Sequence, residues 1–360
     1  MTPGMEIEQR RLFLATALAT SGQRRVAIII AGIAAVLFFI AAPFAQVPLA
    51  RMPAFIPSYE AALVFIDVVT AVLLYEQFAR LRLPGILVLA SAYLFEALLI
   101  IPHALTFPGA FSETGLLGAK TQTTAWLYTF WHSGFSLFVI AYALLRRRDK
   151  NPISDSRVAL PIAVSILCVA LLATALVLMV TWGHDYLPVM IQGTSYSQAI
   201  YKGVNPTTWL LNFAAMLMLW QRRQRVVDLW LMLVMWIWLF DIALAAILGA
   251  ARFDFGFYAG RIFGLVASSF LLIMLVIELG AMYAGALGAV HSAEQKLARL
   301  RSSQSAIPPR NEHTKLFIRR QNIAHYRQLL DSGTLDPAQR RAIEKLLSEE
   351  EQQSGSTPAA

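Results

Sequence analysis

The stretch at residues 26–45, VAIIIAGIAAVLFFIAAPFA, runs for 20 residues without a charged or hydrogen-bonding side chain. A helix of that length spans roughly 30 Å, which is the thickness of the hydrocarbon core of a bilayer. Seven further apolar runs follow along the chain, at residues 58–78, 83–105, 124–145, 159–181, 207–220, 229–250 and 262–284. The run at 207–220 is the shortest of them. We therefore predict an all-α fold, a polytopic transmembrane bundle of about eight spans over residues 26–284.

The composition agrees with a protein that has lipid as its solvent. Of the 360 residues, 57% are hydrophobic and 14% are charged, whereas a soluble domain has about 45–50% and about 25%. The net charge of +8 does not indicate a nucleic-acid partner, because the basic residues lie in the connections between apolar runs. The single cysteine, Cys168, lies inside an apolar run and excludes a disulfide within one chain.

The basic residues also predict the orientation. Fourteen of those in the connections fall on the side of the N-terminus, and five fall on the opposite side: Arg51, Lys120, Lys202, Arg252 and Arg261. Positive charge favours the cytoplasmic side. We therefore expect a bacterial inner-membrane protein with residues 1–25 in the cytoplasm, and with eight spans the C-terminus returns there too.

The non-cytoplasmic connections combine prolines and glycines with large apolar groups, over residues 46–59, 105–123 and 182–206. Two interpretations are open. The segments fold back onto the outer face of the bundle, or their aromatic side chains rest among the lipid headgroups.

The charged tail is predicted to contain three further parts. Residues 285–309 form a juxtamembrane helix, to about residue 301, and a linker that paired prolines break. Residues 310–352 form a helical hairpin, in which Asp336 caps the second helix, Pro337 takes its first position and Gln339 reaches back to the cap. Residues 353–360 have the composition of a disordered tail.

Two segments carry a resemblance to a known family. Residues 101–135, IPHALTFPGAFSETGLLGAKTQTTAWLYTFWHSGF, and residues 48–63, PLARMPAFIPSYEAAL, resemble the fourth class of bacterial membrane-associated sensor domains, the MASE group. The resemblance covers roughly residues 25–285. It implies an input role in signal transduction, with no known ligand and no established binding residues.

Such a sensor domain usually precedes a cyclase or a histidine kinase in the same chain. Only about 70 residues follow the last span, which is too few for either domain, and they contain no GGDEF string and no glycine-rich ATP-binding box. We therefore expect a sensor without its own catalytic output that signals through a separate cytoplasmic protein, bound at residues 310–352. The chain has no nucleophile–base motif and no HExxH string, so we do not expect an enzyme. The sequence indicates no cofactor, and it leaves the oligomeric state open.

Five ionisable residues are predicted to share one level of the membrane. Asp67, Glu96 and Asp241 each lie nine residues from the outer end of their spans, and His132 lies eight residues from the outer end of its own. At about 1.5 Å per residue this is roughly 13 Å below the outer boundary. His103 lies two turns outward from Glu96 on nearly the same face.

We expect these five residues to form a ligand-binding pocket in the outer half of the bundle. Because the sequence predicts no Lys or Arg at their depth, the acids would need protons, a cation or a ligand. His103 and His132 are the candidate ligands if the cation is a metal. Two alternatives stay open: each residue bonds a neighbouring helix and serves packing alone, or the acidic layer belongs to a proton- or cation-coupled transporter.

Other polar and aromatic residues are assigned less specific roles. Snorkelling or surface ion pairs account for Glu60, Glu76 and Glu278. An interfacial belt accounts for Trp126, Tyr128 and Trp131 better than a cofactor site does. Topology accounts for Arg146, Arg147 and Arg148, with anionic lipid as the alternative.

Overall fold

The structure, a computed structural model, describes residues 16–146, 158–192, 195–197, 203–221, 225–305, 312–332 and 335–355. The chain divides into two compact units, residues 1–282 and 283–360. We describe each unit by itself.

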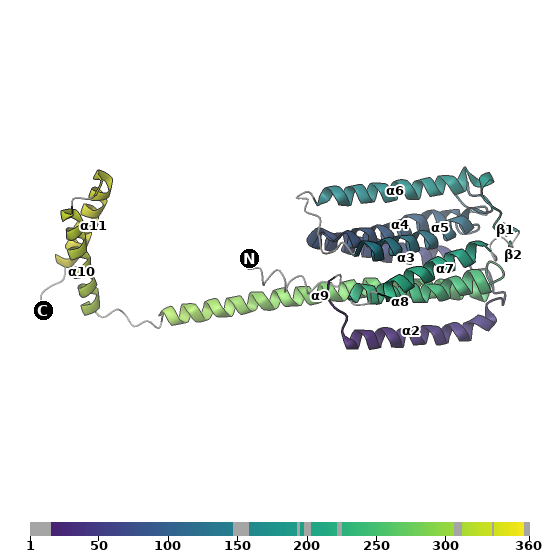
Figure 1. Ribbon diagram of the computed structural model, residues 1–360, viewed down its shortest axis with the longest axis horizontal. Helices are drawn as coiled ribbons and strands as arrows, with labels where there is room; N and C mark the ends of the chain where they lie inside the picture. Colours follow the sequence, from purple (N-terminus) through teal and green to yellow (C-terminus); the bar gives the residue numbers. More distant parts are fainter. Residues whose placement is uncertain are drawn as a thin grey trace. The chain divides into compact units, whose positions relative to one another are not determined.

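Eight helices of the described residues run alongside one another in the first unit (Figure 1). They are α2 (Ser21–Ala41), α3 (Phe55–Leu81), α4 (Pro84–Thr106), α5 (Thr123–Leu145), α6 (Ala159–Thr181), α7 (Asn205–Trp220), α8 (Val226–Ile242) and the first part of α9 (Phe255–Ser305). α8 continues as a π-helix, η5 (Ala243–Leu248). The predicted polytopic helical bundle is therefore confirmed.

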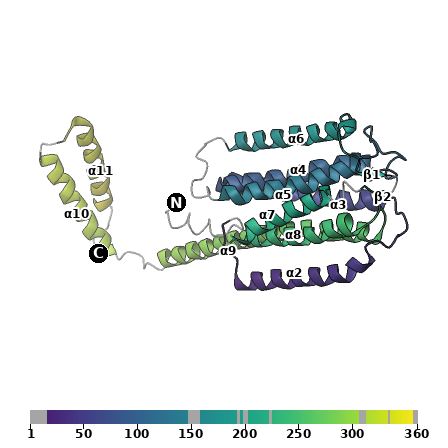
Figure 2. The same cartoon turned by 45° about the vertical axis from the view of Figure 1, so that its right-hand side comes forward.

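Seven of these helices, counting α8 with η5, are long and apolar enough to cross a membrane, within the described part of the chain. The exception is α7, whose 16 residues span about 24 Å, less than a bilayer core of roughly 30 Å. It begins two residues before the predicted run at 207–220 and packs between α5 and α8 (Figure 2). α7 therefore belongs to the bundle although its length alone does not identify a span.

The first helix begins earlier than its apolar run. Thr20 Oγ1 accepts a hydrogen bond from Gln23 N at 3.2 Å, and Gln23 Oε1 accepts one from Thr20 N at 2.9 Å. This capping box starts α2 at Ser21, so Arg24 and Arg25 are helical. The helix therefore begins within the predicted N-terminal segment 1–25, of which residues 1–15 lie outside the described residues.

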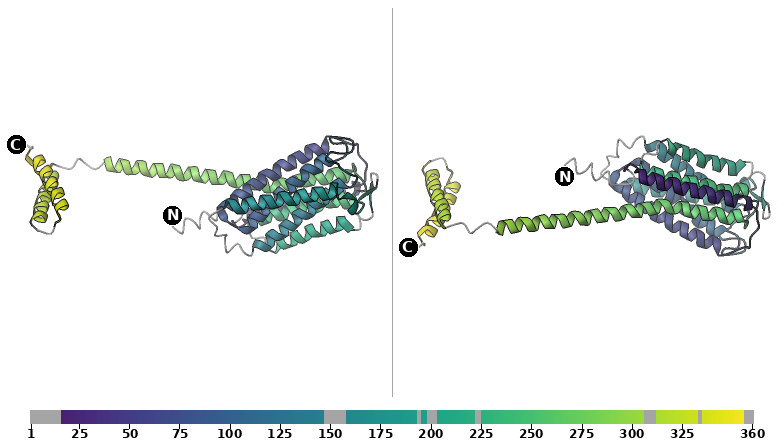
Figure 3. Two further views of the ribbon diagram at one scale, coloured as in Figure 1. Left: turned by 90° about the horizontal axis from the view of Figure 1, so that it is seen from above. Right: turned by 90° about the horizontal axis from the view of Figure 1, so that it is seen from below.

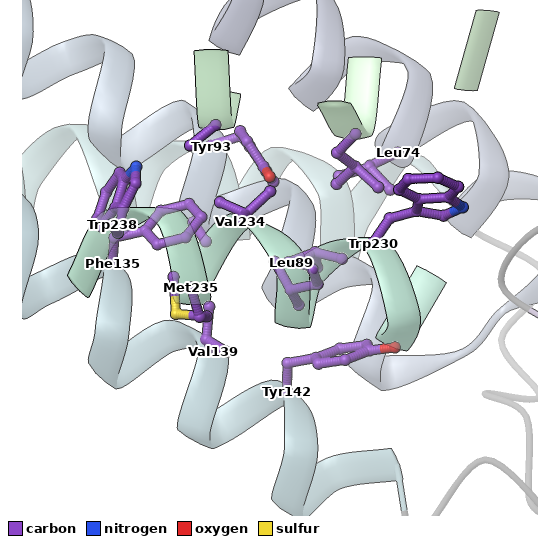
Figure 4. Packing of buried hydrophobic residues seen from close by; sticks show 14 of the residues in the cluster. Leu74, Leu89, Tyr93, Phe135, Val139, Tyr142, Trp230, Val234, Met235 and Trp238 are labelled. Atoms are coloured by element: carbon purple, nitrogen blue, oxygen red, sulfur yellow. The ribbon is translucent and has the colours of Figure 1, made fainter. Parts of the chain in front are cut away.

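The interior of the bundle is formed around α4 and α8, the two helices with the most buried spans. Figure 4 shows Leu74, Leu89 and Val234 packed with larger rings between α3, α4, α5 and α8. The ring of Phe135 lies 4.9 Å from Trp238 and 5.1 Å from Tyr93. By contrast, α6 and α2 lie on opposite sides of the bundle (Figure 3) and expose most of their apolar side chains, as helices facing lipid do.

The described residues of four connections, within 45–54, 107–122, 182–204 and 249–254, meet at one end of the bundle, which we call the loop end. Arg51 Nη2 donates to the Pro108 carbonyl at 3.0 Å, and Pro48 forms a β-bridge with Asp254. Trp126 Nε1 donates to the Pro188 carbonyl at 3.2 Å. A two-residue antiparallel ladder, β1 (Ile191–Gln192) with β2 (Ser195–Tyr196), lies in the third connection. Of our two interpretations of these segments, the contacts support folding onto the bundle.

The second unit contains the remainder of α9 and a helical hairpin, α10 (Glu312–Asp331) and α11 (Pro337–Gly355). Asp336 Oδ1 accepts from the amides of Ala338 and Gln339, each at 2.8 Å, and Gln339 Oε1 accepts from Asp336 N at 3.2 Å. This is the predicted capping box. Ion pairs join the two helices, Arg319 with Glu350 at 3.2 Å and Arg327 with Glu351 at 2.6 Å.

The predicted C-terminal ends of two helices, α9 and α11, need correction. α9 continues to Ser305, four residues past the predicted end at 301, and the predicted break at its proline pair lies outside the described residues. α11 continues to Gly355, so the first three residues of the predicted disordered tail 353–360 are helical. Residues 356–360 also lie outside the described residues.

Candidate functional site

A buried acid–base pair joins α3 to α4 near the loop end. Glu60 Oε1 and His103 Nδ1 lie 2.7 Å apart, and their side chains are 1% and 2% exposed. The assignment of Glu60 to snorkelling at the rim is therefore wrong. Glu60 lies seven residues before Asp67, two helical turns away, so both carboxyl groups are on the inward face of α3.

A second bond joins α4 to α5 one layer deeper. Trp131 Nε1 donates to Glu96 Oε1 at 2.8 Å, and both residues are buried. The ring of Trp131 lies 4.5 Å from the ring of His132 and 6.1 Å from that of His103. Trp131 therefore does not belong to an interfacial belt. It connects one predicted site acid with both predicted site histidines.

A third pair joins α5 to α8. His132 Nε2 lies 3.3 Å from Asp241 Oδ2, and His132 Nδ1 lies 2.9 Å from the carbonyl oxygen of Tyr128. The carbonyl oxygen can only accept a hydrogen bond, so Nδ1 must carry a proton. The contact between Nε2 and Oδ2 then requires one further proton, which resides on the imidazole or on the carboxyl group.

Asp67 is the least satisfied of the predicted site residues. It is fully buried, and neither carboxyl oxygen has a hydrogen-bond partner among the described residues. Its carboxyl group interacts electrostatically with that of Glu96, and both acids interact electrostatically with Tyr93. A buried carboxyl group without a partner is costly in its charged form, which is why such groups in membrane proteins often hold protons or bind ligands.

The last bundle helix approaches the third pair through two glycines. A Cβ atom on Gly264 would lie 2.9 Å from Asp241 Oδ2, and one on Gly260 would lie 2.9 Å from Asp241 Oδ1. Only residues without side chains permit α9 this close to Asp241. The sequence analysis missed these positions, although the four-residue spacing of Gly256, Gly260 and Gly264 is typical of close helix packing in membranes.

The five predicted site residues are thus brought into one buried network, with Glu60, Trp131 and Tyr93 as additional members. Glu96 interacts electrostatically with both Asp67 and Asp241. In the described residues, no group of three or more His, Cys, Asp or Glu side chains could hold a metal ion. Each of the two histidines considered as metal ligands faces one carboxyl group instead.

A small cavity opens at the loop end beside this network. It has a water-accessible volume of about 40 Å³. Its polar lining comes from His103, Thr124, Tyr128, Thr129, Asn205, Arg252 and Arg261. Arg261 is only 6% exposed and lies between Gly260 and Gly264, which both face Asp241, so the expectation that no basic residue reaches this level is wrong. Arg261 lies in the first turns of α9. Its guanidinium carbon lies 3.6 Å from the centroid of the Phe257 ring, and this cation–π contact stabilises the charge inside the bundle.

Two further polar contacts lie toward the opposite end. Arg146 forms an ion pair with the buried Asp228, which also accepts from Tyr142 Oη at 2.8 Å. Topology alone therefore does not account for Arg146, and Arg147 and Arg148 lie outside the described residues. Gln77 Nε2 donates to Glu278 Oε2 at 2.6 Å across α3 and α9, so Glu278 is buried rather than snorkelling.

The surface ion pair expected for Glu76 is present. Glu76 forms an exposed ion pair with Arg80, one turn along α3. Trp126 and Tyr128 are partly buried, and the ring of Tyr128 lies 4.0 Å from that of His132. Their assignment to an interfacial belt stays a prediction.

The sequence was also compared with known proteins. A family model described as "Membrane-associated sensor, integral membrane domain" (MASE4) matches residues 50–283. No curated protein and no solved structure matches the chain.

Proposed function

Because the chain belongs to the MASE4 family of membrane-associated sensors, we propose that it receives a signal in the buried polar network near the loop end and passes it to a separate cytoplasmic protein. The stimulus acts by binding a small ligand or by moving a proton. In this proposal the loop end faces away from the cytoplasm, and both termini lie in the cytoplasm of a bacterial cell, as the distribution of basic residues favours. The chain itself catalyses no reaction.

One observation carries the proposal: the network contacts the helix that continues out of the bundle. Asp241 is paired with His132 at 3.3 Å and touches the backbone of α9 at Gly260 and Gly264. α9 is a single helix from Phe255 to Ser305. A change of charge or position at Asp241 therefore acts directly on a helix that extends beyond the first unit.

Signalling further requires two states that the stimulus distinguishes. The proton between His132 and Asp241 offers such a difference. With the proton on the imidazole, the pair consists of two opposite charges, and with the proton on the carboxyl group both members are neutral. A ligand that favours one of these arrangements would change the force between α5 and α8, and α9 packs against the same carboxyl group.

The hairpin of α10 and α11 is the proposed contact for the partner protein. Its helices have many charged side chains and expose the apolar side chains of Phe317 and Leu346. Two short helices bury little apolar surface between them, so a hairpin of this size gains stability from a partner. Deleting residues 310–352 should abolish recovery of the partner from detergent-solubilised membranes. If the partner is still recovered, the hairpin is not the output contact.

Hydrogen exchange of the full-length protein in nanodiscs tests the transmission step. Asp241→Asn keeps the size of the side chain and removes its charge. We expect it to change the exchange of amides in residues 283–305, while Arg80→Gln, a change of an exposed ion pair on α3, leaves them as in the wild type. Equal exchange in all three proteins would refute transmission through α9.

A further inference from the structure

We propose that the cavity at the loop end binds one small carboxylate anion, or the carboxylate end of a larger molecule, between Arg252 and Arg261. The inference rests on the proposed function only for the claim that binding produces a signal. The binding itself is a separate property of the cavity and can be measured alone.

The charge of the cavity favours an anion. Arg252 and Arg261 line it, and the described residues of its lining include no Asp or Glu. Among the described residues, no carboxylate lies within 4.0 Å of the Arg261 guanidinium, which donates one hydrogen bond, to the Phe257 carbonyl at 2.9 Å. A buried guanidinium without a nearby counterion is costly, and a bound anion would remove that cost.

Two acids on neighbouring segments, Asp254 and Asp241, have partners of their own, although Oδ1 of Asp241 has none among the described residues. Asp254 accepts from the amides of Ala250, Ala251 and Phe257, at 2.8, 3.1 and 2.7 Å. Asp241 faces His132 at 3.3 Å. Neither acid is within ion-pair distance of Arg261 in the described structure.

The aromatic residues orient both guanidinium groups. Arg261 lies over the ring of Phe257 at 3.6 Å, and Arg252 lies over the ring of Phe107 at 5.3 Å. Stacking occupies the flat faces of a guanidinium and leaves its N–H groups in the plane. A planar fork of N–H donors matches the two oxygens of a carboxylate. Arg252 also donates to Thr124 Oγ1, which holds it at the cavity wall.

The size of the cavity limits the ligand. Its water-accessible volume is about 40 Å³, and a single water needs roughly 10–15 Å³ on the same measure. The space therefore suits a group of about three non-hydrogen atoms, such as a carboxylate. A larger molecule would place only its end group here, with the rest among the loops.

The cavity touches the buried network at one residue, His103. Its Nδ1 is bonded to Glu60 at 2.7 Å, so Nε2 is the ring nitrogen that this pair leaves for a ligand. An anion in the cavity would lie beside His103, the residue that bonds α4 to Glu60 on α3. This gives an anion a direct route to α3 and α4.

Equilibrium dialysis of the full-length protein in detergent, with radiolabelled acetate at constant ionic strength, tests the site. We expect saturable binding of one acetate per chain. Arg261→Gln and Arg252→Gln should each weaken binding at least about tenfold, as the loss of a charge-assisted hydrogen bond does. Arg80→Gln removes an equal charge from the exposed face of α3 and should bind as the wild type does.

Competitors identify the ligand class. Displacement by hexanoate at lower concentrations than by unlabelled acetate would assign the site to the end group of a longer molecule, and the reverse order would assign it to a free small carboxylate. Absence of saturable binding in the wild type would overturn the proposal. So would wild-type affinity in a folded Arg261→Gln protein, or displacement by phosphate at lower concentrations than by any carboxylate.

The two proposals can fail independently. Loss of acetate binding in the arginine variants supports this site even if exchange in residues 283–305 never changes. A changed exchange in Asp241→Asn supports transmission even if acetate does not bind.

Discussion

The substitution Gly264→Ala places one methyl group on α9 against Asp241 Oδ2, an atom of the buried network. The new Cβ would lie 2.9 Å from Asp241 Oδ2 and 3.2 Å from Tyr59 Oη. Ordinary contact begins at 3.4 Å, so Oδ2 or the helix must move by about 0.5 Å. Oδ2 is also the atom that faces His132 Nε2 at 3.3 Å. A displacement of that size along the pair would lengthen the contact beyond the hydrogen-bond range, about 3.5 Å.

Gly280→Ala is the matched control, because Gly280 lies on the same helix and a Cβ there meets nothing within 4 Å. Both variants gain the same helix propensity, about 1 kcal/mol. Only Gly264→Ala adds the cost of overpacking, typically about 1–3 kcal/mol. We therefore expect Gly264→Ala to melt roughly 3–10 °C below Gly280→Ala in detergent, with the scan rate held constant.

A double-mutant cycle with His132→Gln shows whether the cost passes through the pair. If the methyl group acts by separating Asp241 from His132, its effect should be smaller once His132 is absent, by at least about 0.5 kcal/mol. Equal melting temperatures for Gly264→Ala and Gly280→Ala, together with additive effects in the cycle, would refute the close contact between α9 and Asp241.

Three further predictions concern other contacts. Asp228→Asn removes the buried carboxylate that forms an ion pair with Arg146, the residue after α5, and should destabilise the bundle by about 3–5 kcal/mol, whereas Arg80→Gln should change stability by less than about 1 kcal/mol; similar chemical-denaturation midpoints for the two would contradict this. Trp131→Phe removes the donor to a buried carboxylate on α4 and should cost about 1–3 kcal/mol, more than Trp126→Phe at the loop end. A larger loss of thermal stability in Trp126→Phe than in Trp131→Phe would show that the hydrogen bond from the Trp131 indole does not stabilise the bundle. Asp336→Ala should cost about 1 kcal/mol of helix stability and raise hydrogen exchange at residues 337–341 of the full chain; unchanged exchange there would mean that the cap does not limit fraying.

Much of the fold could be predicted from local pattern. Long apolar runs identified the bundle helices because each must satisfy its own backbone in lipid. The capping box at Asp336 was predictable because a cap involves residues only three positions apart. The weakest prediction was the run at 207–220, and its helix, α7, is the one too short to be identified as a span.

The candidate site was predictable only in part. The depth of Asp67, Glu96, His132 and Asp241 follows from their positions along their spans. Their partners do not follow from it, because the rotation of each helix about its axis is set by packing against helices distant in sequence. Glu60 was assigned to the rim for this reason, although its side chain is 1% exposed.

The sequence by itself determined that this chain is a membrane-embedded helical bundle, since lipid imposes a requirement on each helix separately, and its similarity to the MASE4 family gives the sensor role. It also determined which helices carry acids and at what depth. The tertiary structure decided which groups meet: Asp241 with His132 and the glycines of α9, and Arg261 with the cavity beside His103. The pairing of His132 with Asp241 joins helix faces from positions 109 residues apart, and no local pattern encodes which faces meet.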